Sequence, residues 1–247
     1  MIHKIETFIE DKKAISVNDD IVNIFNSKTN EYVLCIGEVQ SGKTNAILRS
    51  LRRCYKLNYK IAIVLGGVNN SLNYQTINDI KNEFAKETSQ GKASIITKDN
   101  FISFSKYGNK RMKDDVFYIV CLLKGADALK KLKEYFLDSV FSKDYDAAIF
   151  DDECDYASVQ TFRDQKTISK LIKLMQENFN SVKSLSITGT PFSNIRNKAF
   201  NKYDSSMIIK HGNEYTGSEY FINHNKNTYM SIPGKDLQDI LFNSLCT

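Results

Sequence analysis

The stretch GEVQSGKT, from Gly37 to Thr44, decides the fold class of this chain of 247 residues. It matches the pattern G-x-x-x-x-G-K-S/T at every position, and it directly follows the apolar run Tyr32–Ile36. The two glycines of such a loop permit backbone turns that aim amide N–H groups at phosphates, and the helix that begins at the second glycine adds the positive end of its dipole. The pattern arises by chance in roughly one chain of this length in a hundred. A glycine-rich turn that binds nothing is the simpler alternative, but the strand-like run before the loop and the helical pattern after it favour a phosphate loop.

Several polar side chains of this stretch have a role in binding a nucleotide. Lys43 supplies a point charge for the β and γ phosphates, and the Thr44 hydroxyl is a ligand for Mg²⁺. We therefore predict a site for a nucleotide and Mg²⁺, with Lys43 among its catalytic groups. The residues predicted to bind the cofactor are Gly37, Gln40, Ser41, Gly42, Lys43, Thr44 and Asn45.

A second apolar run, Ala147–Phe150, leads directly into the acidic sequence DDECD at residues 151–155. Nucleotide hydrolysis requires one acid that holds the water shell of Mg²⁺ and another that polarises the attacking water. We assign Asp152 to the metal and Glu153 to the water, with Asp151 as an alternative for either role. An acidic cluster by itself is more often a solvated loop or a weak calcium site. Its position after a phosphate loop, at the end of a buried strand, favours the catalytic interpretation.

A third block, ITGTP, follows the apolar run Ser184–Ile187. Small hydroxyl residues at a strand end are able to sense the γ-phosphate and to pass its state to a partner surface. We predict this coupling role for Thr188, Gly189 and Thr190. A simple turn is the alternative, and the block gains weight because it is the third element in the expected order.

Short apolar runs alternate with longer amphipathic ones along the chain. The runs expected to form strands are Tyr32–Ile36, Lys60–Leu65, Ala93–Thr97, Val116–Leu123, Ala147–Phe150 and Ser184–Ile187. The helical patterns cover residues 42–57, 71–88, 126–141 and 166–180. Near-continuous Val, Ile and Leu is typical of strands covered on both faces. We predict an α/β domain over residues 31–200, with a mostly parallel sheet and helices on both faces, between a helical extension at 1–30 and a C-terminal extension at 201–247.

The composition is that of an intracellular globular protein. Hydrophobic residues make up 42% and charged residues 26%, and the longest apolar runs are too short to span a bilayer. Five cysteines without a CxxC pair favour reduced core thiols and a cytoplasmic location. The net charge of +5 is compatible with a polyanionic partner. The basic stretch Lys106–Lys113 is more simply a solvated loop than a nucleic-acid contact, and the three histidines show no spacing for zinc.

Taken in this order, the three blocks resemble those of the superfamily-two (DEAD-like) helicase and translocase ATPases. Within that group the sequence is similar to the Z-one domain (endonuclease) family, whose members are found near bacterial restriction and defence genes. The resemblance rests on GEVQSGKT, VLGGVNNSLNYQT, IFDDECDYAS, ITGTPFSN and EYTGSEYF, which together span residues 37–221.

The resemblance implies a RecA-like P-loop ATPase domain with ATP and Mg²⁺ as cofactors. Residues 152–155 would be the DEAD-like box, and Asn70, Gln75 and Thr76 would lie in the element that such enzymes turn toward nucleic acid, with DNA favoured over RNA. The implied function is the ATP-binding and ATP-hydrolysing motor half of a nucleic-acid-remodelling protein in bacterial restriction or phage defence.

Two features depart from the family pattern. Residues 1–36 contain no glutamine, so the glutamine that reads adenine in DEAD-box proteins has no counterpart, and Phe25 or Tyr32 would have to stack on the base instead. Superfamily-two enzymes work with two RecA-like halves, the second of which supplies arginine fingers, whereas Arg196 is the only arginine after Pro191. We therefore expect a second half or a partner protein to supply the fingers, and only weak turnover by this chain alone.

Three other interpretations compete with this one. The sequence NKYD at residues 201–204 fits the guanine-reading pattern N-K-x-D, but no glycine follows an aspartate at the D-x-x-G spacing that GTPases require. Small-molecule kinases share the phosphate loop, yet they rarely carry D-D-E-x-D followed by T-G-T-P. The main alternative is a regulatory domain that binds nucleotide with little or no turnover of its own.

Overall fold

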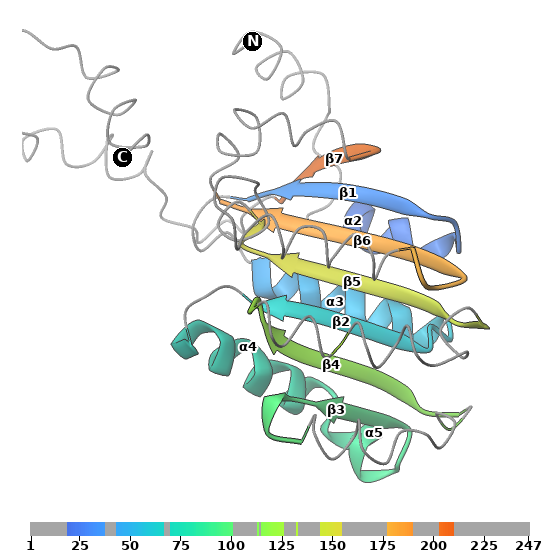
Figure 1. Cartoon of the computed structure of the whole chain (residues 1–247), viewed down its shortest axis with the longest axis vertical. Coiled ribbons are helices and arrows are strands. Elements are labelled where there is room, and N and C mark those ends of the chain that lie inside the picture. Colours follow the sequence, from blue (N-terminus) through green and yellow to red (C-terminus); the bar gives the residue numbers. More distant parts are fainter. Residues whose placement is uncertain are drawn as a thin grey trace, which may run out of the picture.

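The computed structural model of the chain describes residues 19–37, 43–66, 70–100, 113, 115–125, 132, 144–154, 177–189 and 203–209. Within these ranges, seven parallel strands form one sheet in the order β3-β4-β2-β5-β6-β1-β7 (Figure 1). The strands are β1 (Glu31–Ile36), β2 (Ile61–Gly66), β3 (Ala93–Ile96), β4 (Phe117–Leu123), β5 (Asp146–Asp152), β6 (Ser181–Thr188) and β7 (Ser205–Ile208). The predicted parallel sheet is confirmed.

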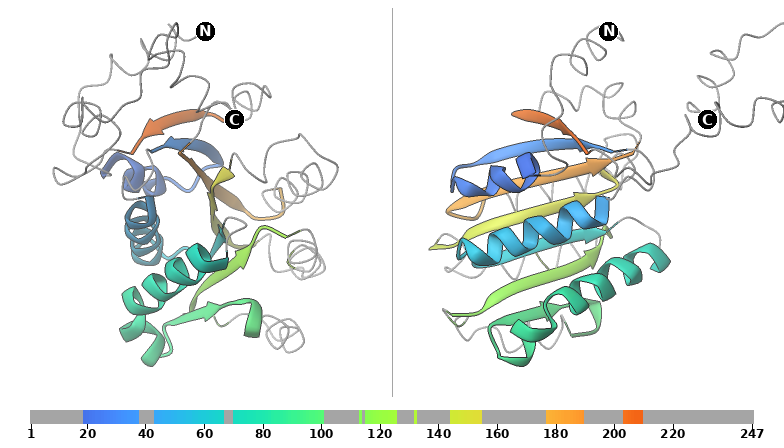
Figure 2. Two further views of the ribbon diagram at one scale, coloured as in Figure 1. Left: turned by 90° about the vertical axis from the view of Figure 1, so that its left-hand side faces the viewer. Right: turned by 180° about the vertical axis from the view of Figure 1, so that it is seen from behind.

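Four described α-helices and one 3-10 helix lie on one face of this sheet, as both views in Figure 2 show. They are α2 (Asp19–Asn23), the 3-10 helix η1 (Ile24–Asn26), α3 (Lys43–Lys56), α4 (Asn70–Glu83) and α5 (Ala85–Ser89). In α3 the fully buried apolar residues Ala46, Ile47, Leu51 and Cys54 recur at helical spacing. One side of α3 therefore packs on the sheet, and its other side carries polar and basic residues.

Hydrophobic residues on both faces of the sheet hold the fold together. Strand β2 is buried at every position, because central parallel strands are covered from both sides. Its alternate residues divide between two clusters: Ala62 and Val64 join the cluster that contains the helices, whereas Ile61, Ile63 and Leu65 join the cluster on the opposite face. Because successive side chains of a strand point to opposite faces, β2 contributes to the hydrophobic clusters on both faces of the sheet.

Part of the predicted N-terminal extension belongs to this core. Ile21, Ile24 and Phe25 are buried, and the Phe25 ring stacks on Phe150 of β5 with 5.6 Å between ring centroids. Phe25 is fully buried, so it would have to leave the core to stack on a nucleotide base. The interpretation of Phe25 as a base-stacking residue is therefore corrected.

The six predicted strands are all present, and the helical patterns at 42–57 and 71–88 correspond to α3 and to α4 with α5. Strands β5 and β6 are longer than predicted, and β7 was not predicted at all. The predicted helix at 126–141 lies outside the described residues, apart from the buried Leu132. The predicted helix at 166–180 also lies largely outside them, and residues 177–180 form a turn and bend instead of a helix end.

Candidate nucleotide-binding site

The described residues of the three sequence blocks meet at the carboxyl edge of the sheet, because β6 lies between β1 and β5 and all three strands are parallel. Ile36 at the end of β1 is paired with Thr188 at the end of β6, and Asp152 at the end of β5 is paired with Ile187. The backbone N–H of Gly37 donates to the carbonyl oxygen of Thr188 at 2.9 Å. The first residue of the phosphate loop is thus bonded directly to the first residue of the predicted coupling block.

Helix α3 begins at Lys43, so its free N–H groups and the positive end of its dipole lie at this same edge. Its first turn contains no acidic residue that would compensate the dipole. Lys43 and Thr44 are half-buried, whereas Asn45 is exposed. The other predicted cofactor residues, Gln40, Ser41 and Gly42, lie outside the described residues, as does Thr190 of the coupling block.

The pKa of Asp152 depends on burial and on charged residues that include one from the acidic strand end and one from the phosphate loop. Burial raises the pKa of its carboxyl above the ordinary value of 3.8, and the carboxylate of Glu153 acts in the same direction, against the opposing effects of Lys124 and Lys43. The influence of Lys43 shows that the lysine of the phosphate loop lies within electrostatic range of the acidic strand end. A buried carboxylate with a raised pKa is stabilised by a nearby cation.

The two aspartates that end β5 lie on opposite faces of the sheet. Phe150 belongs to the core cluster beneath α3, so the strand period of two places Asp152 on the face of α3. Asp151 is 2% exposed on the other face, where its Oδ1 lies 3.0 Å from Nζ of Lys124. The geometry therefore supports Asp152 over Asp151 for a role beside the phosphate loop.

Glu153 follows β5 in a backbone conformation that is rare for its residue type. Its φ is 52°, in the left-handed region that glycine and asparagine adopt more easily, at a typical cost of about 1–3 kcal/mol. Its backbone N–H donates to Oδ1 of Asp152 at 3.1 Å. Strain of this kind concentrates at functional sites, where the surroundings hold it in place.

Lys124, directly after β4, holds this strained turn, and sequence reasoning missed it. Its side chain is fully buried, pairs with Asp151, and donates to the carbonyl oxygens of Asp152 and of Glu153, the latter at 2.8 Å. The only signal in the sequence is that a charged residue ends the apolar run Val116–Leu123. A lone lysine at that position matches no motif, so its contacts became visible only in the fold.

Of the segment that fits N-K-x-D, the structure describes Tyr203 and Asp204, whereas Asn201 and Lys202 lie outside the described residues. Oδ2 of Asp204 accepts the backbone N–H of Tyr32 at 2.8 Å, near the start of β1 and therefore toward the edge opposite the phosphate loop. Tyr203 donates from its hydroxyl to Sγ of Cys154 at 3.9 Å, and burial raises its pKa. These contacts anchor the residues before β7 to β1 and to the turn after β5.

The residues implied for nucleic-acid contact lie on α4. Asn70 is its first residue and follows the carboxyl end of β2, so α4 begins at the same edge of the sheet as α3. Gln75 is exposed and Thr76 is half-buried on the second turn of the helix. Within the coupling block, Thr188 is fully buried and Gly189 is half-buried.

Cysteine chemistry and a preformed metal cage have no support in the part of the chain that the structure describes. Cys35, Cys54, Cys121 and Cys154 are buried thiols that form no disulfide, and burial raises the pKa of the first three, as expected for core thiols. No group of three or more His, Cys, Asp or Glu side chains able to hold a metal ion occurs in the described ranges. None of the described helices has the length and apolar character needed to cross a membrane.

Comparison with known proteins identifies the fold. No protein-family model and no curated protein matches the sequence. Among solved structures, the DEAD-box helicase Mss116 bound to ssRNA and UDP-BeF aligns with 86% of this chain and 43% of its own, with a TM-score of 0.58 and 15% identity. The Hef helicase domain of Pyrococcus furiosus aligns with 78% of this chain and 39% of its own, with a TM-score of 0.52 and 12% identity. The DUF1998 helicase MrfA bound to DNA and AMPPNP aligns with 83% and 28%, with a TM-score of 0.52 and 9% identity.

These similarities define the class of fold. The chain has the fold of a RecA-like helicase domain, as the resemblance implied, and it spans less than half the length of each of these three chains. Because the sequence identities are only 9–15%, these similarities establish the fold alone.

Proposed function

We propose that this chain is the ATP-binding and ATP-hydrolysing motor half of a protein that remodels nucleic acid. The observation that carries the proposal is the carboxyl edge of the sheet, where Gly37 bonds to Thr188 and Lys43 acts electrostatically on Asp152. The fold supports the class of reaction, and the nucleic acids bound to Mss116 and MrfA support a nucleic-acid partner. The defence role rests on the resemblance to the Z-one family alone.

The oxygen atoms at this edge fit Mg²⁺ bound together with a nucleotide. Mg²⁺ prefers hard oxygen ligands and keeps several waters, so phosphates and one or two protein oxygens complete its coordination. The carboxylate of Asp152 and the hydroxyl of Thr44 would be those oxygens, and the raised pKa of Asp152 fits a carboxylate that a cation stabilises. When bound, Mg²⁺ neutralises charge on the β and γ phosphates.

The residues of this chain have separate roles in the proposed reaction. Lys43 and the N–H groups at the start of α3 bind the phosphates, and Glu153 orients and polarises the attacking water. Lys124 is a positioning residue, because its bonds to the carbonyl oxygens of Asp152 and Glu153 fix the turn that directs the Glu153 side chain. The block from Thr188 to Thr190 passes the state of the site to a partner surface.

Full activity also requires cations on the far side of the γ-phosphate. An arginine finger contributes on the order of 10³–10⁵ in rate. Within our proposal a second RecA-like half or a partner protein supplies it, because Arg196 is the only arginine after Pro191. The chain by itself then binds ATP and hydrolyses it slowly, and it neither separates nor moves along strands of DNA, the favoured partner.

Two variants test the proposal by separating binding from turnover. We expect Lys43→Ala to weaken the calorimetric affinity for Mg-ATP by roughly 100-fold, since a charge-assisted contact to the phosphates is lost. Glu153→Gln keeps the shape of the side chain, so we expect unchanged affinity and a fall in turnover of about 100-fold. Turnover is measured with single-stranded DNA, with duplex DNA and without DNA. Lys86→Ala, which removes an exposed lysine of α5, is the matched control.

Each outcome has a defined meaning. Unchanged ATP affinity in Lys43→Ala would contradict the assignment of the phosphate site. Tight binding by the wild type with no turnover under any condition would support the regulatory-domain alternative. Rapid, DNA-stimulated hydrolysis by this chain alone would show that no second half is needed.

A further inference from the structure

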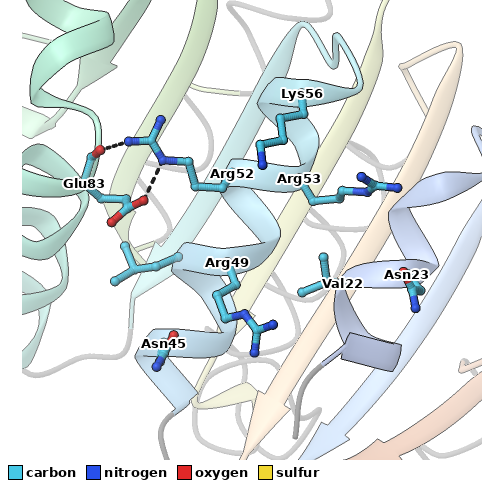
Figure 3. A pocket seen from close by; sticks show the side chains of 9 residues that line it. Val22, Asn23, Asn45, Arg49, Arg52, Arg53, Lys56 and Glu83 are labelled. Atoms are coloured by element: carbon cyan, nitrogen blue, oxygen red, sulfur yellow. Dashed lines mark hydrogen bonds and ion pairs between the residues drawn. The ribbon is translucent and has the colours of Figure 1, made fainter. Parts of the chain in front are cut away.

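Arg52, in the third turn of α3, ties this helix to the end of α4. Its Nε donates to Oε1 of Glu83 at 2.5 Å, its Nη1 donates to Oε1 of Glu87 at 2.7 Å, and its Nη2 donates to the backbone carbonyl oxygen of Glu83. Figure 3 looks into a groove of about 400 Å³ along α3 and shows Arg52 turned toward Glu83, whereas Arg53 extends toward α2. A single side chain of α3 thus bonds to both α4 and α5.

Packing also fixes the guanidinium of Arg52. It lies 4.3 Å from the centroid of the Phe84 ring, at the junction between α4 and α5. Phe84 is fully buried, and its ring centroid lies 6.1 Å from that of Tyr55 of α3 and 6.0 Å from that of Phe117 of β4. A planar guanidinium that stacks on a ring and bonds to two carboxylates holds a defined geometry, which the single ammonium of a lysine does not reproduce.

The charges at this junction compensate each other. Glu83 is the last residue of α4, where the helix dipole favours a cation over a carboxylate, and Arg52 supplies the cation from the neighbouring helix. The hydrogen bond from Arg52 lowers the pKa of Glu87 below its ordinary value of 4.5, against the opposing effect of burial. Only 28% of the Arg52 side chain and 15% of the Glu87 side chain are exposed, so water screens this pair less than a pair on the open surface.

Helix α4 depends on this junction more than α3 does. In residues 74–83 of α4, where the structure describes side chains, the buried ones are Ile77 and Ile80. Because a helix with few buried contacts is held less firmly, the bonds from Arg52 contribute a large share of what fixes α4. The buried residues of α3 are more numerous: Ala46, Ile47, Ser50, Leu51 and Cys54.

The junction lies behind the edge of the sheet at which both helices begin. Nine residues at about 1.5 Å each place Arg52 about 13 Å along the helix axis from Lys43, the first residue of α3. Helix α4 runs from Asn70 at the same edge to Glu83 at the junction. Energetic coupling between sites is carried by packed side chains, hydrogen bonds and rigid helices. A change at the start of α3 therefore has a physical route to α4.

We propose that Arg52 is a positioning residue that makes α4 respond to the nucleotide bound at the start of α3. The nucleotide fixes the first turn of α3, and Arg52 fixes α4 with it, through Glu83 and Glu87. Helix α4 contains Gln75 and Thr76, which the resemblance implies for nucleic-acid contact, so the state of the nucleotide is passed to that helix. We rest this inference on the ATP site of the proposed function and add the route by which that site acts on α4.

Amide hydrogen exchange of the whole chain, followed by mass spectrometry with and without Mg-AMPPNP, tests this route. In the wild type we expect the nucleotide to slow exchange in residues 43–56, and also in residues 75–83 by about fivefold or more, the lower end of typical coupling between sites. In Arg52→Met the effect on residues 43–56 should remain, and the effect on residues 75–83 should fall below about twofold. Arg53→Met is the matched control, because the neighbouring arginine bonds to Asn26 instead of α4, and it should respond as the wild type does.

Further variants separate positioning from a general loss of stability. Arg52→Lys keeps the charge but not the forked geometry, so residues 75–83 should respond to an intermediate extent. The double variant Glu83→Gln, Glu87→Gln should also weaken this response. Adding Arg52→Met to it should leave the response no lower than in Arg52→Met alone, because the changes break the same link. The double variant takes the place of Arg52→Met if the latter fails to fold.

Calorimetry with Mg-AMPPNP distinguishes failure of this route from failure of the ATP site. Each variant should bind AMPPNP within about threefold of the wild type, since none lies in the phosphate loop. Normal binding with no response of residues 75–83 in the wild type, with an undiminished response in Arg52→Met, or with an equal loss in Arg53→Met would overturn the inference and leave the ATP site standing. No binding of AMPPNP by the wild type would refute the ATP site, and the inference with it.

Discussion

Lys183 at the amino end of the parallel sheet and Lys124 at its carboxyl end are both buried, and the surroundings of these two lysines differ. At the amino end, Lys183 of β6 donates to Ser27 at 2.9 Å, to Thr29 at 3.1 Å and to Glu31 at 2.6 Å. These are polar side chains at or near the surface, and they tie the segment before β1 to the sheet. At the carboxyl end, Lys124 binds a buried aspartate and two backbone carbonyl oxygens of a strained turn.

Other pairs of residues repeat this difference between the two ends. The described non-glycine residues with positive φ are Asn58, in the turn that precedes β2, and Glu153, which follows β5. Asparagine tolerates this conformation, whereas glutamate does so at a larger cost. Strand β5 begins with Asp146, whose pKa is lowered, and ends with Asp152, whose pKa is raised. The amino end is thus built for stability, and the carboxyl end keeps strain and poorly compensated charge where the proposed chemistry takes place.

The largest expected effect comes from replacing Lys124 or Lys183 by methionine. Lys124→Met removes the cation that lies 3.0 Å from the buried carboxylate of Asp151, so we expect a loss of about 3–5 kcal/mol in the free energy of unfolding. Lys183→Met leaves partners that water reaches, and we expect a loss of about 1–2 kcal/mol. Chemical denaturation of both variants measures the difference.

A double variant shows whether Lys124 is needed for ATP turnover, through the turn at Glu153, or only for the stability of the fold. Replacing a buried ion pair by apolar residues is often neutral, so Lys124→Met combined with Asp151→Leu should recover most of the lost stability. The carbonyl oxygens of Asp152 and Glu153 still lack their donor, so ATP turnover should stay low. Recovery of turnover together with stability would reduce Lys124 to a structural role.

We expect smaller changes in stability from replacing the two non-glycine residues with positive φ, one at each end of the sheet. Glu153→Gly removes the strain of a glutamate at a φ of 52°, so we expect a gain of up to about 1 kcal/mol in stability, partly offset by the greater entropy of the unfolded chain. Asn58→Gly should change stability by no more than about 0.3 kcal/mol, because asparagine already adopts this conformation easily. Thermal unfolding compares the two, and equal gains would show that the turn at Glu153 carries no special strain.

Much of the fold could be predicted because the sequence patterns involved are local. The apolar runs and the loop from Gly37 to Thr44 fixed the strands, α3 and the parallel arrangement. Strand β7 escaped prediction because Ser205–Ile208 is short, half-exposed and only partly apolar, and what makes it a strand is its pairing with β1, from which it is distant in sequence. Short edge strands depend on such non-local contacts more than on their own composition.

The candidate site was predictable only where a motif named its residues. The choice between Asp151 and Asp152 follows from the strand period of two, since Phe150 faces α3 and so does Asp152. Lys124 could not be found in this way, because its partners lie 28 and 29 residues further along the chain and meet it only through the pairing of β4 and β5 with β2. The exposed position of Asn45 depends likewise on which side of α3 packs against the sheet.

Another small expected effect is the pH dependence of stability that comes from Asp146 at the amino end. Partial burial raises the pKa of this carboxyl, but hydrogen bonds from Ser181 at 2.5 Å, from Lys28 and from Asn180 at 3.0 Å outweigh it and hold the pKa below 3.8. A lowered pKa in the folded state means that the ionised form stabilises the fold, and that this stabilisation is lost as pH falls through the folded pKa.

We expect Asp146→Asn to lose about 0.5 kcal/mol in the free energy of unfolding, because Lys28 is largely solvated. The loss should be constant between about pH 5 and 7 and should shrink toward zero below about pH 3.8. Urea unfolding over this pH range measures the loss, and Lys28→Met should show the same dependence. If the loss instead grew on acidification, the pKa of Asp146 would have to be raised, and the contrast between the two ends of β5 would not hold.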